Sequence, residues 1–383
     1  MWSDNETEND LLDFDYLVAV IRSVIDNKDL LPTTIGIFGD WGGGKSSLIK
    51  MVCSQVEAEG NKKVLCVSFN GWLFEGYQDA KTAMMSTILE EIADKRTLAP
   101  KATNHLKKLF KKINLMRLAL LASKGAAGYA MYGEFGMALA VLGDIPELAK
   151  KLAEKWQGVS PDEIEKLLRD TAATDQKLHL SIQEFHRDFE EFLAESNIET
   201  LVVFIDDLDR CTPDTIIGTL EAIKLFLFAP QTVFVVGADE RLVQHAVRRR
   251  FPELPGDRAD VGRDYLEKLI QFPVRIPPLG RVEFETYLNL LFIKLARLND
   301  EQFEKLRKAA LNRSPEHLYD MTFTLDVVEE VLGAVPSELR DSLALAGYIA
   351  PILTAGSSGN PRQAKRFLNT LVMRKTMAGS KGI

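Results

Sequence analysis

The chain has 383 residues, of which 46% are hydrophobic and 27% are charged, a composition that can bury one large core or two moderate ones. Its formal net charge of −8 does not indicate direct nucleic-acid binding, which would favour a basic domain. The acidic N-terminus resembles neither a signal nor a transit peptide, and the three cysteines share no metal-ligand spacing, so a reducing cytoplasm is the expected compartment.

A helix, a strand, a glycine-rich loop and a second helix are expected in succession near the N-terminus. After a helical pattern over 14–26, residues 34–38 are typical of a buried strand, and residues 47–52 open a helix. The loop matches G-x-x-x-x-G-K-[ST] and consists of Gly39, Asp40, Trp41, Gly42, Gly43, Gly44, Lys45, Ser46 and Ser47. This order of elements predicts a phosphate-binding loop.

The residue types in this loop suit a nucleoside triphosphate. Glycines allow backbone N–H groups to surround a phosphate, and the N-terminus of the following helix adds partial positive charge. Lys45 is expected to reach the β- and γ-phosphates, and Ser46 to offer its hydroxyl to Mg²⁺. ATP is the expected nucleotide, because the chain contains no Asn-Lys-x-Asp string of the kind that reads guanine.

A second strand is expected over 63–69, followed by a helix over 79–95. The strand ends in Asn70-Gly71-Trp72, near the sheet edge where the phosphate loop is expected. Trp72 is expected to be a packing anchor rather than a group that stacks on a base.

Three carboxylates follow a further buried strand. Residues 201–205 form a continuous apolar, β-branched run, which predicts a strand buried on both faces of a parallel sheet. Asp206 follows directly and is the expected Mg²⁺ ligand, because open α/β sheets hold ligands at the carboxyl ends of strands. Asp207 is the first candidate for the acid that activates the attacking water, and Asp209 is the second. The alternative is an acidic loop that caps the helix beginning near residue 213.

The rest of the chain completes the sheet and then becomes helical. Residues 232–237 predict a fourth strand ending at Asp239, either a γ-phosphate sensor or a helix cap, and residues 272–278 predict a short last strand. Helices are expected over 213–227, 282–298, 300–311, 325–332, 337–350 and 362–375. Four arginines are candidates for a finger supplied to a neighbouring subunit: Arg248, Arg249, Arg250 and Arg263.

Residues 100–176 interrupt the alternation of strands and helices and predict a helical insertion. The stretch 101–117 has six basic residues and no acid, and the apolar stretch 118–142 is divided by Lys124 and Glu134. Because a spanning helix needs about 20 mostly apolar residues, two soluble packed helices are favoured. Membrane contact through 101–142, as a peripheral or re-entrant hairpin, is the alternative, and a transmembrane hairpin is favoured least.

Several of these stretches together resemble the KAP P-loop NTPases, a bacterial and animal group within the additional-strand class of P-loop ATPases. The resemblance spans most of the chain and rests on residues 37–47, 69–72, 206–210, 265–273 and 359–369. It implies a sheet in which one inserted strand separates the strand before the phosphate loop from the strand before the acids. It also implies an insertion between these two motifs.

The predicted fold class is therefore an α/β P-loop NTPase of the additional-strand class. A parallel sheet flanked by helices would carry a helical insertion between the Walker motifs and a C-terminal helical lid. The predicted domains are an NTPase core of 1–99 and 177–279, an insertion of 100–176 and a lid of 280–383.

The resemblance implies a chain that binds and hydrolyses Mg-ATP to switch or drive a partner complex. Because the family includes phage-exclusion proteins, the expected partners are protein subunits of a bacterial anti-phage defence complex, and an arginine finger in trans would require a homo-oligomer. The alternative is a nucleotide-stabilised scaffold with negligible turnover at the inner face of the membrane. In related ATPases an arginine of the lid contacts the γ-phosphate. Arg362 is therefore the sensor candidate, with Lys365 and Arg366 as alternates.

Overall fold

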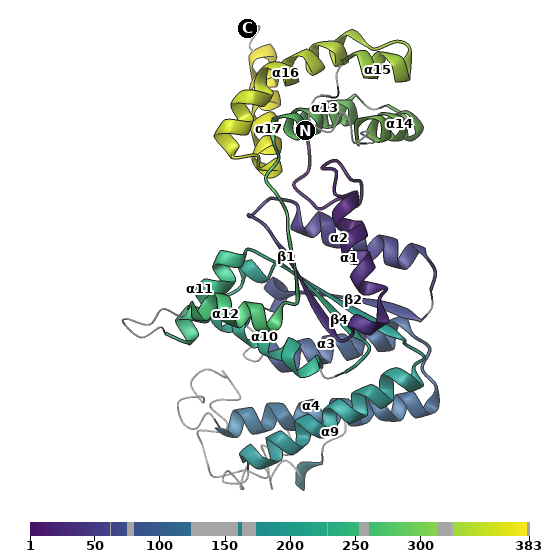
Figure 1. Cartoon of the computed structure of the whole chain (residues 1–383), viewed down its shortest axis with the longest axis vertical. Coiled ribbons are helices and arrows are strands. Elements are labelled where there is room, and N and C mark those ends of the chain that lie inside the picture. Colours follow the sequence, from purple (N-terminus) through teal and green to yellow (C-terminus); the bar gives the residue numbers. More distant parts are fainter. Residues whose placement is uncertain are drawn as a thin grey trace. The chain divides into compact units, whose positions relative to one another are not determined.

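The computed structural model of the chain describes residues 1–61, 63–74, 80–123, 160–162, 174–227, 229–252, 260–296, 298–311, 323 and 325–380. Within these residues, five strands form one sheet in the order β2-β3-β4-β1-β5 (Figure 1). The strands are β1 (Thr33–Phe38), β2 (Val64–Asn70), β3 (Thr200–Asp206), β4 (Thr232–Ala238) and β5 (Phe272–Arg275). As the family resemblance implies, β4 lies between β1 and β3.

Most of the described helices lie on stretches that the sequence predicts to be helical, and α12 is an addition. They are α1 (Asp15–Ile25), α2 (Lys45–Ala58), α3 (Ala80–Lys95), α4 (Pro100–Ser123), α9 (Thr174–Glu195), α10 (Pro213–Phe226), α11 (Glu240–Arg250), α12 (Val261–Leu269), α13 (Arg281–Leu295), α14 (Asp300–Leu311), α15 (Leu325–Leu332), α16 (Ser337–Ser357) and α17 (Pro361–Ser380). The short 3₁₀ turns η2 (Gly71–Phe74) and η4 (Leu208–Arg210) follow β2 and β3.

Helix α16 is longer than the sequence predicts. The expected end at residue 350 lies directly before Pro351, and a proline ring in a helix interior removes a hydrogen bond at a cost of about 3 kcal/mol. The helix instead continues through Pro351 to Ser357 and ends at Ser358, which has a left-handed φ of 50°. Packing of α16 against α13 offsets the penalty, an example of tertiary contacts outweighing local propensity.

The chain forms two compact units. One consists of Met1–Ser23, Ile37–Gln55 and Val274–Ile383, and the other of Val24–Gly36 and Val56–Pro273. The phosphate loop therefore belongs with the N-terminal segment and the C-terminal helices, whereas the acids after β3 belong with the second unit. The sequence-based division differs, because it places both motifs in one core and makes the C-terminal helices a domain of their own.

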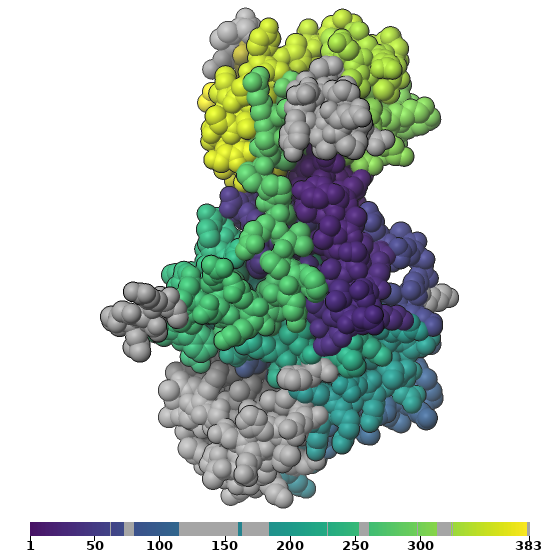
Figure 2. All heavy atoms as spheres, viewed as in Figure 1, coloured from purple at the N-terminus to yellow at the C-terminus, as the bar shows by residue number. Residues whose placement is uncertain are grey.

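The core of the first unit joins the N-terminal segment to the C-terminal helices. Trp2 and Leu11 are buried in one cluster with apolar side chains of α13 to α17, among them Phe284, Leu291 and Leu368. Figure 1 shows the N-terminus beside α13, and Figure 2 shows the atoms of the C-terminal helices, lime to yellow, in close contact with one another. The first residues of the chain are thus part of the helical core.

The core of the second unit is built on the buried central strands. Every residue of β4 is buried, and so is every residue of β3 before Asp206, as expected for strands covered on both faces. Phe189 of α9 meets Phe226 of α10 edge-on, with ring centroids 5.1 Å apart, and Phe226 lies 6.0 Å from Phe234 of β4 with the rings tilted. Strands β2, β3 and β4 are parallel, and their register sets Asn70 opposite Asp206.

Candidate functional site

The phosphate loop connects β1 to α2 in the conformation that its glycines permit. Gly42 and Gly44 have φ values of +86° and +105°, which side-chain-bearing residues rarely adopt. The N–H of Gly43 donates to the carbonyl of Asp40 at 3.0 Å and closes the turn. The buried ammonium of Lys45 lies over the loop, donating to the carbonyls of Gly39 at 3.0 Å and of Asp40 at 3.3 Å. A cation held over a loop at a helix N-terminus fits the β- and γ-phosphates of a nucleotide.

Two segments pack so tightly against this loop that its glycines are also required for space. A Cβ on Gly42 would lie 2.7 Å from Cβ of Arg362, and a Cβ on Gly44 would lie 2.7 Å from the ring of Phe14. Arg362 is the second residue of α17, and Phe14 directly precedes α1. The start of the last helix and the N-terminal segment therefore both contact the phosphate loop.

A cation at a helix N-terminus is electrostatically unfavourable, so Arg362 is expected to have a stabilising partner, and the structure shows one. Its guanidinium lies over the ring of Trp41, 4.7 Å from the centroid, and its Nε is 3.5 Å from a carboxylate oxygen of Asp4. Arg366 repeats both contacts, 5.1 Å from the Trp41 ring and 3.2 Å from the same oxygen of Asp4. The carboxylate of Asp4 offsets the repulsion between these cations and the positive end of the helix dipole.

Asn360 joins α17 to the phosphate loop directly. Its side-chain oxygen accepts hydrogen bonds from the N–H groups of Arg362 and Gln363, as a helix cap does, while its Nδ2 donates to the carbonyl of Trp41 at 2.9 Å. The Asn-Pro pair is the signal that could have assigned this role from the sequence, because a capping residue before an N1 proline marks a helix start.

The N-terminal segment continues the same set of contacts, which the sequence reasoning did not anticipate. The N–H of Thr7 donates to Oγ of Ser47 at 3.2 Å, and Glu8 lies 3.6 Å from Lys50 on α2. Asp10 is buried and accepts hydrogen bonds from three backbone N–H groups between Leu12 and Asp15. Burial raises the pKa of Asp10, whereas these hydrogen bonds act in the opposite direction. Ser47 thus anchors the N-terminal segment.

The three acids at and after the end of β3 form hydrogen bonds and ion pairs with different partners. Asp206 ends the strand, and its Oδ1 accepts the N–H of Asp207 at 2.8 Å. Asp207 has a left-handed φ of 56°, and its carboxylate lies between Arg210 Nε at 2.8 Å and Asn70 Nδ2 at 3.1 Å. Asp209 instead accepts the N–H of Asp239 at 3.2 Å and so connects η4 to the end of β4. Sparsely populated backbone conformations such as that of Asp207 cluster at functional sites.

A family model described as the KAP family P-loop domain matches residues 15–378. The chain belongs to the KAP family of P-loop NTPases. It is also similar to an uncharacterized protein of Methanocaldococcus jannaschii, with 27% identity over 174 residues that cover 42% of this chain and 84% of that protein. Family membership indicates nucleotide binding by the KAP domain and agrees with the geometry of the phosphate loop.

Asp239 takes one of the two roles expected for it, whereas Trp72 departs from its expected role. Asp239 is a helix cap, since its carboxylate accepts the N–H of Arg241 and forms an ion pair with the same side chain at 2.7 Å. Trp72 is not a buried anchor. Its side chain is 51% exposed, and Arg210 lies 5.9 Å from its ring centroid. The ring is exposed because η2 turns the chain outward directly after β2.

Two of the candidate finger arginines are held by acids of their own chain. Arg248 pairs with Asp260 at 2.9 Å, and Arg263 pairs with Glu267 at 2.7 Å. Asp260 also caps α12 by accepting the N–H of Arg263, and these contacts lower its pKa. Both arginines therefore have a structural role between α11 and α12 or along α12.

Helix α4 is the main described part of the expected insertion, and it packs against α9, most of which belongs to the predicted core. Helices α4 and α9 lie side by side, and acids of α9 face the basic side of α4 (Figure 1). Lys112 pairs with Asp188 at 2.6 Å and Glu184 at 3.1 Å, and Lys101 lies 3.7 Å from Glu195. Within the described residues no helix is both long and apolar enough to cross a membrane. The apolar stretch from residue 124 to 142 lies outside the described residues.

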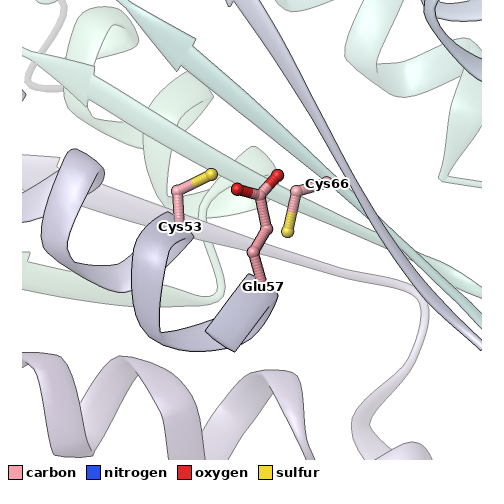
Figure 3. A group of neighbouring side chains, drawn as sticks. All are labelled: Cys53, Glu57 and Cys66. Carbon is pink, nitrogen blue, oxygen red and sulfur yellow. The ribbon is translucent and has the colours of Figure 1, made fainter. Parts of the chain in front are cut away.

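Two of the three cysteines, Cys53 and Cys66, lie closer together than their sequence spacing indicates. Figure 3 shows Cys53 and Glu57 one turn apart on α2, with Cys66 on β2, and their ligand atoms lie within 4.8 Å of one another. Sequence spacing could not reveal this group, because it depends on the packing of a helix against a strand. Cys211 is buried after η4, and its Sγ donates to the carbonyl of Asp207 at 3.6 Å.

Proposed function

We propose that this chain is an ATPase that binds and hydrolyses Mg-ATP and uses the nucleotide cycle to switch a partner complex. The observation that carries the proposal is the carboxylate of Asp207. It is held by two donors at the end of the strand after which P-loop ATPases place their catalytic acids. A structural acid cap would not require this orientation, and among the described residues its carboxylate forms no cap hydrogen bond to the helix turn that follows.

The residues of the two motifs fit the nucleotide and the metal by their chemistry. Lys45 would neutralise charge on the β- and γ-phosphates, and the hydroxyl of Ser46 with the carboxylate of Asp206 would hold Mg²⁺. When bound, Mg²⁺ supplies positive charge to the phosphate oxygens and stabilises the leaving group.

Asp207 would act as the base. It accepts a proton as a water oxygen attacks the γ-phosphorus, while the bond to the β–γ bridging oxygen breaks and ADP leaves. Asp209 is the second candidate for this step, but its Oδ2 already accepts the backbone N–H of Asp239.

The C-terminal helices would carry the switch. Arg362 and Asn360 both contact the phosphate loop. A change in the negative charge bound at the loop would therefore alter the electrostatic energy of the residues at the start of α17. Arg362 would exchange Asp4 for the γ-phosphate, with Arg366 as its alternate, because a phosphate is a stronger acceptor for a guanidinium than one carboxylate.

The proposed partner is a protein subunit of a bacterial anti-phage defence complex, and the family resemblance supports this setting. Helix α16 presents Leu345, Tyr348 and Ile352 at helical spacing, and these side chains are 38%, 80% and 72% exposed. Exposed apolar stripes of this kind are typical of protein contact surfaces.

Phosphate release is the experiment that tests the activity. Lys45→Ala should abolish nucleotide binding or weaken it severely, whereas Asp206→Asn and Asp207→Asn should bind nucleotide and stop turnover. Loss of a transition-state contact costs on the order of 3 kcal/mol in the barrier. A wild type that binds ATP but turns over no faster than Lys45→Ala, even with its partner, would establish the nucleotide-stabilised scaffold instead.

A further inference from the structure

The side-chain amide of Asn70 joins the end of β2 to the acidic turn after β3. Its Nδ2 donates to Oδ2 of Asp207 at 3.1 Å, and its Oδ1 accepts the N–H of Trp72 at 3.0 Å. Because the Trp72 N–H can only donate, the oxygen of the amide must face it, and the NH₂ group must face the carboxylate. The orientation of Asn70 is therefore determined by its two partners.

The other contacts of Asp207 come from its own turn. Arg210 reaches Oδ1 from three residues on, and the thiol of Cys211 donates to the Asp207 carbonyl. Asn70 is 137 residues away in the chain and approaches from the neighbouring strand, where the register pairs it with Asp206. Its hydrogen bond thus fixes the position of the carboxylate relative to the sheet. Arg210 fixes it less firmly, because the arginine side chain is long and 34% exposed.

The turn that carries Asn70 is packed firmly against the acidic turn. A Cβ on Gly71 would lie 3.0 Å from Sγ of Cys211, so the two turns are in close contact at this glycine. Trp72 is linked to both donors of Asp207, through its N–H to Asn70 and through its ring to Arg210. Both hydrogen bonds to the Asp207 carboxylate therefore depend on where η2 holds Trp72.

We infer that Asn70 is a positioning residue for Asp207, a role that deepens the proposed function and rests on it. The amide fixes the plane of the carboxylate, so that the oxygen lone pairs are aimed before water arrives. Without the donor, the carboxylate can rotate about its Cβ–Cγ bond, and misplacement of a catalytic group by about 1 Å can cost on the order of 100-fold in rate. The affinity for nucleotide does not depend on this orientation.

The isosteric change Asn70→Asp tests the inference. It keeps an oxygen that accepts the Trp72 N–H and replaces the donor to Asp207 with a second acceptor, so the turn is retained while the hydrogen bond is lost. We expect kcat to fall by roughly 10- to 100-fold, with KM for ATP within about 3-fold of wild type and Tm nearly unchanged. Trp72→Phe, which keeps the backbone N–H, is the matched control and should retain most of kcat.

A double-mutant cycle shows whether Asn70 acts through Asp207. In the Asp207→Asn background, Asn70→Asp should cause no further loss, because the base it positions is already absent. Multiplicative losses would place the action of Asn70 elsewhere and overturn the inference, as would an Asn70→Asp variant that keeps its kcat or loses it together with Tm. A wild type without turnover would overturn the proposed function and this inference together. Wild-type turnover with an unaffected Asn70→Asp variant would overturn the inference alone.

Discussion

Trp2 should be one of the most costly side chains to remove, although it is the second residue of the chain. It is only 9% exposed, its Nε1 donates to the carbonyl of Leu291 at 2.8 Å, and its ring meets Phe292 edge-on at 5.8 Å. Its own backbone N–H and C=O are both bonded to the side-chain amide of Asn369 on α17. The segment that leads to the phosphate loop is therefore anchored at its far end.

The magnitude follows from the area and the hydrogen bond. A buried tryptophan removes about 200 Å² of surface from water. At about 25 cal/mol per Å² this is worth about 5 kcal/mol, an upper estimate because unfolded chains already bury part of it. The Nε1 hydrogen bond adds about 1 kcal/mol. We expect Trp2→Ala to lower the free energy of unfolding by roughly 3 to 5 kcal/mol, below the sum of about 6 kcal/mol because that sum is an upper estimate and alanine keeps part of the buried area.

Urea denaturation followed by far-UV circular dichroism measures the loss, and two variants calibrate it. Trp2→Phe keeps most of the apolar surface and should cost only about 1 kcal/mol, the hydrogen bond. Trp72→Ala removes the same side chain from a half-exposed site and should cost less than about 1 kcal/mol. Equal stability of Trp2→Ala and wild type would mean that the N-terminal segment does not belong to the helical core.

Three further predictions concern charge. Arg362→Ala should reduce the ratio of ATP to ADP affinity toward one while the Tm of the nucleotide-free protein changes by less than about 2 °C, since a partly exposed ion pair at 3.5 Å contributes little. An unchanged ratio would return Arg362 to a surface role. Hydrogen bonds from Lys28 and Lys63 lower the pKa of Glu199 from 4.5 to about 2, so its stabilisation is complete above pH 4.5 and is lost as the pH falls toward 2. Glu199→Gln should therefore flatten the dependence of Tm on pH in this window, and an unaltered dependence would show that the ion pair is not formed in solution. Flotation with anionic liposomes at low salt should leave the protein in the pellet, because Lys101 and Lys112 already pair with acids of α9, whereas salt-sensitive flotation would establish the peripheral membrane contact.

The parts of the fold that were predictable are those whose signal is local. Buried strands such as β3 and β4 are continuous β-branched runs, and the glycine positions of the phosphate loop follow a fixed spacing. The sheet order was available only through the family resemblance, because apolar runs alone do not determine which strands are neighbours. The proximity of Asn70 and Asp207 could be predicted in part, because both strands were expected to end at one sheet edge. Their hydrogen bond could not, because it depends on the register of β2 against β3, which the sequence alone does not determine.

The N-terminal segment shows why the remainder could not be predicted. Its residues have little periodicity, and each contact joins positions far apart in the chain, up to the 367 residues between Trp2 and Asn369. The acidic composition of this stretch argues against a targeting peptide but does not indicate that one of its acids, Asp4, pairs with both Arg362 and Arg366. A single tryptophan in an otherwise polar segment was the available signal, because an exposed ring of that size is costly without a partner.

The carboxylate of Asp4 also explains how three cationic side chains can lie together at the N-terminus of α17, beside the phosphate loop. Arg362, Lys365 and Arg366 lie within the first two turns of α17, where the helix dipole disfavours positive charge. Burial lowers the pKa of Lys365, and the nearby charges of Lys294 and Arg362 lower it further, whereas Asp4 acts in the opposite direction. The carboxylate of Asp4 and the carbonyl of Ser3, which accepts a hydrogen bond from Lys365, stabilise the cluster without using an anion from solution. The N-terminal segment thus supplies to α17 the negative charge that a γ-phosphate would supply in the proposed ATP-bound state. In that proposed state the carboxylate of Asp4 and the γ-phosphate would compete for Arg362, and this competition would give the proposed lid a way to respond to the nucleotide.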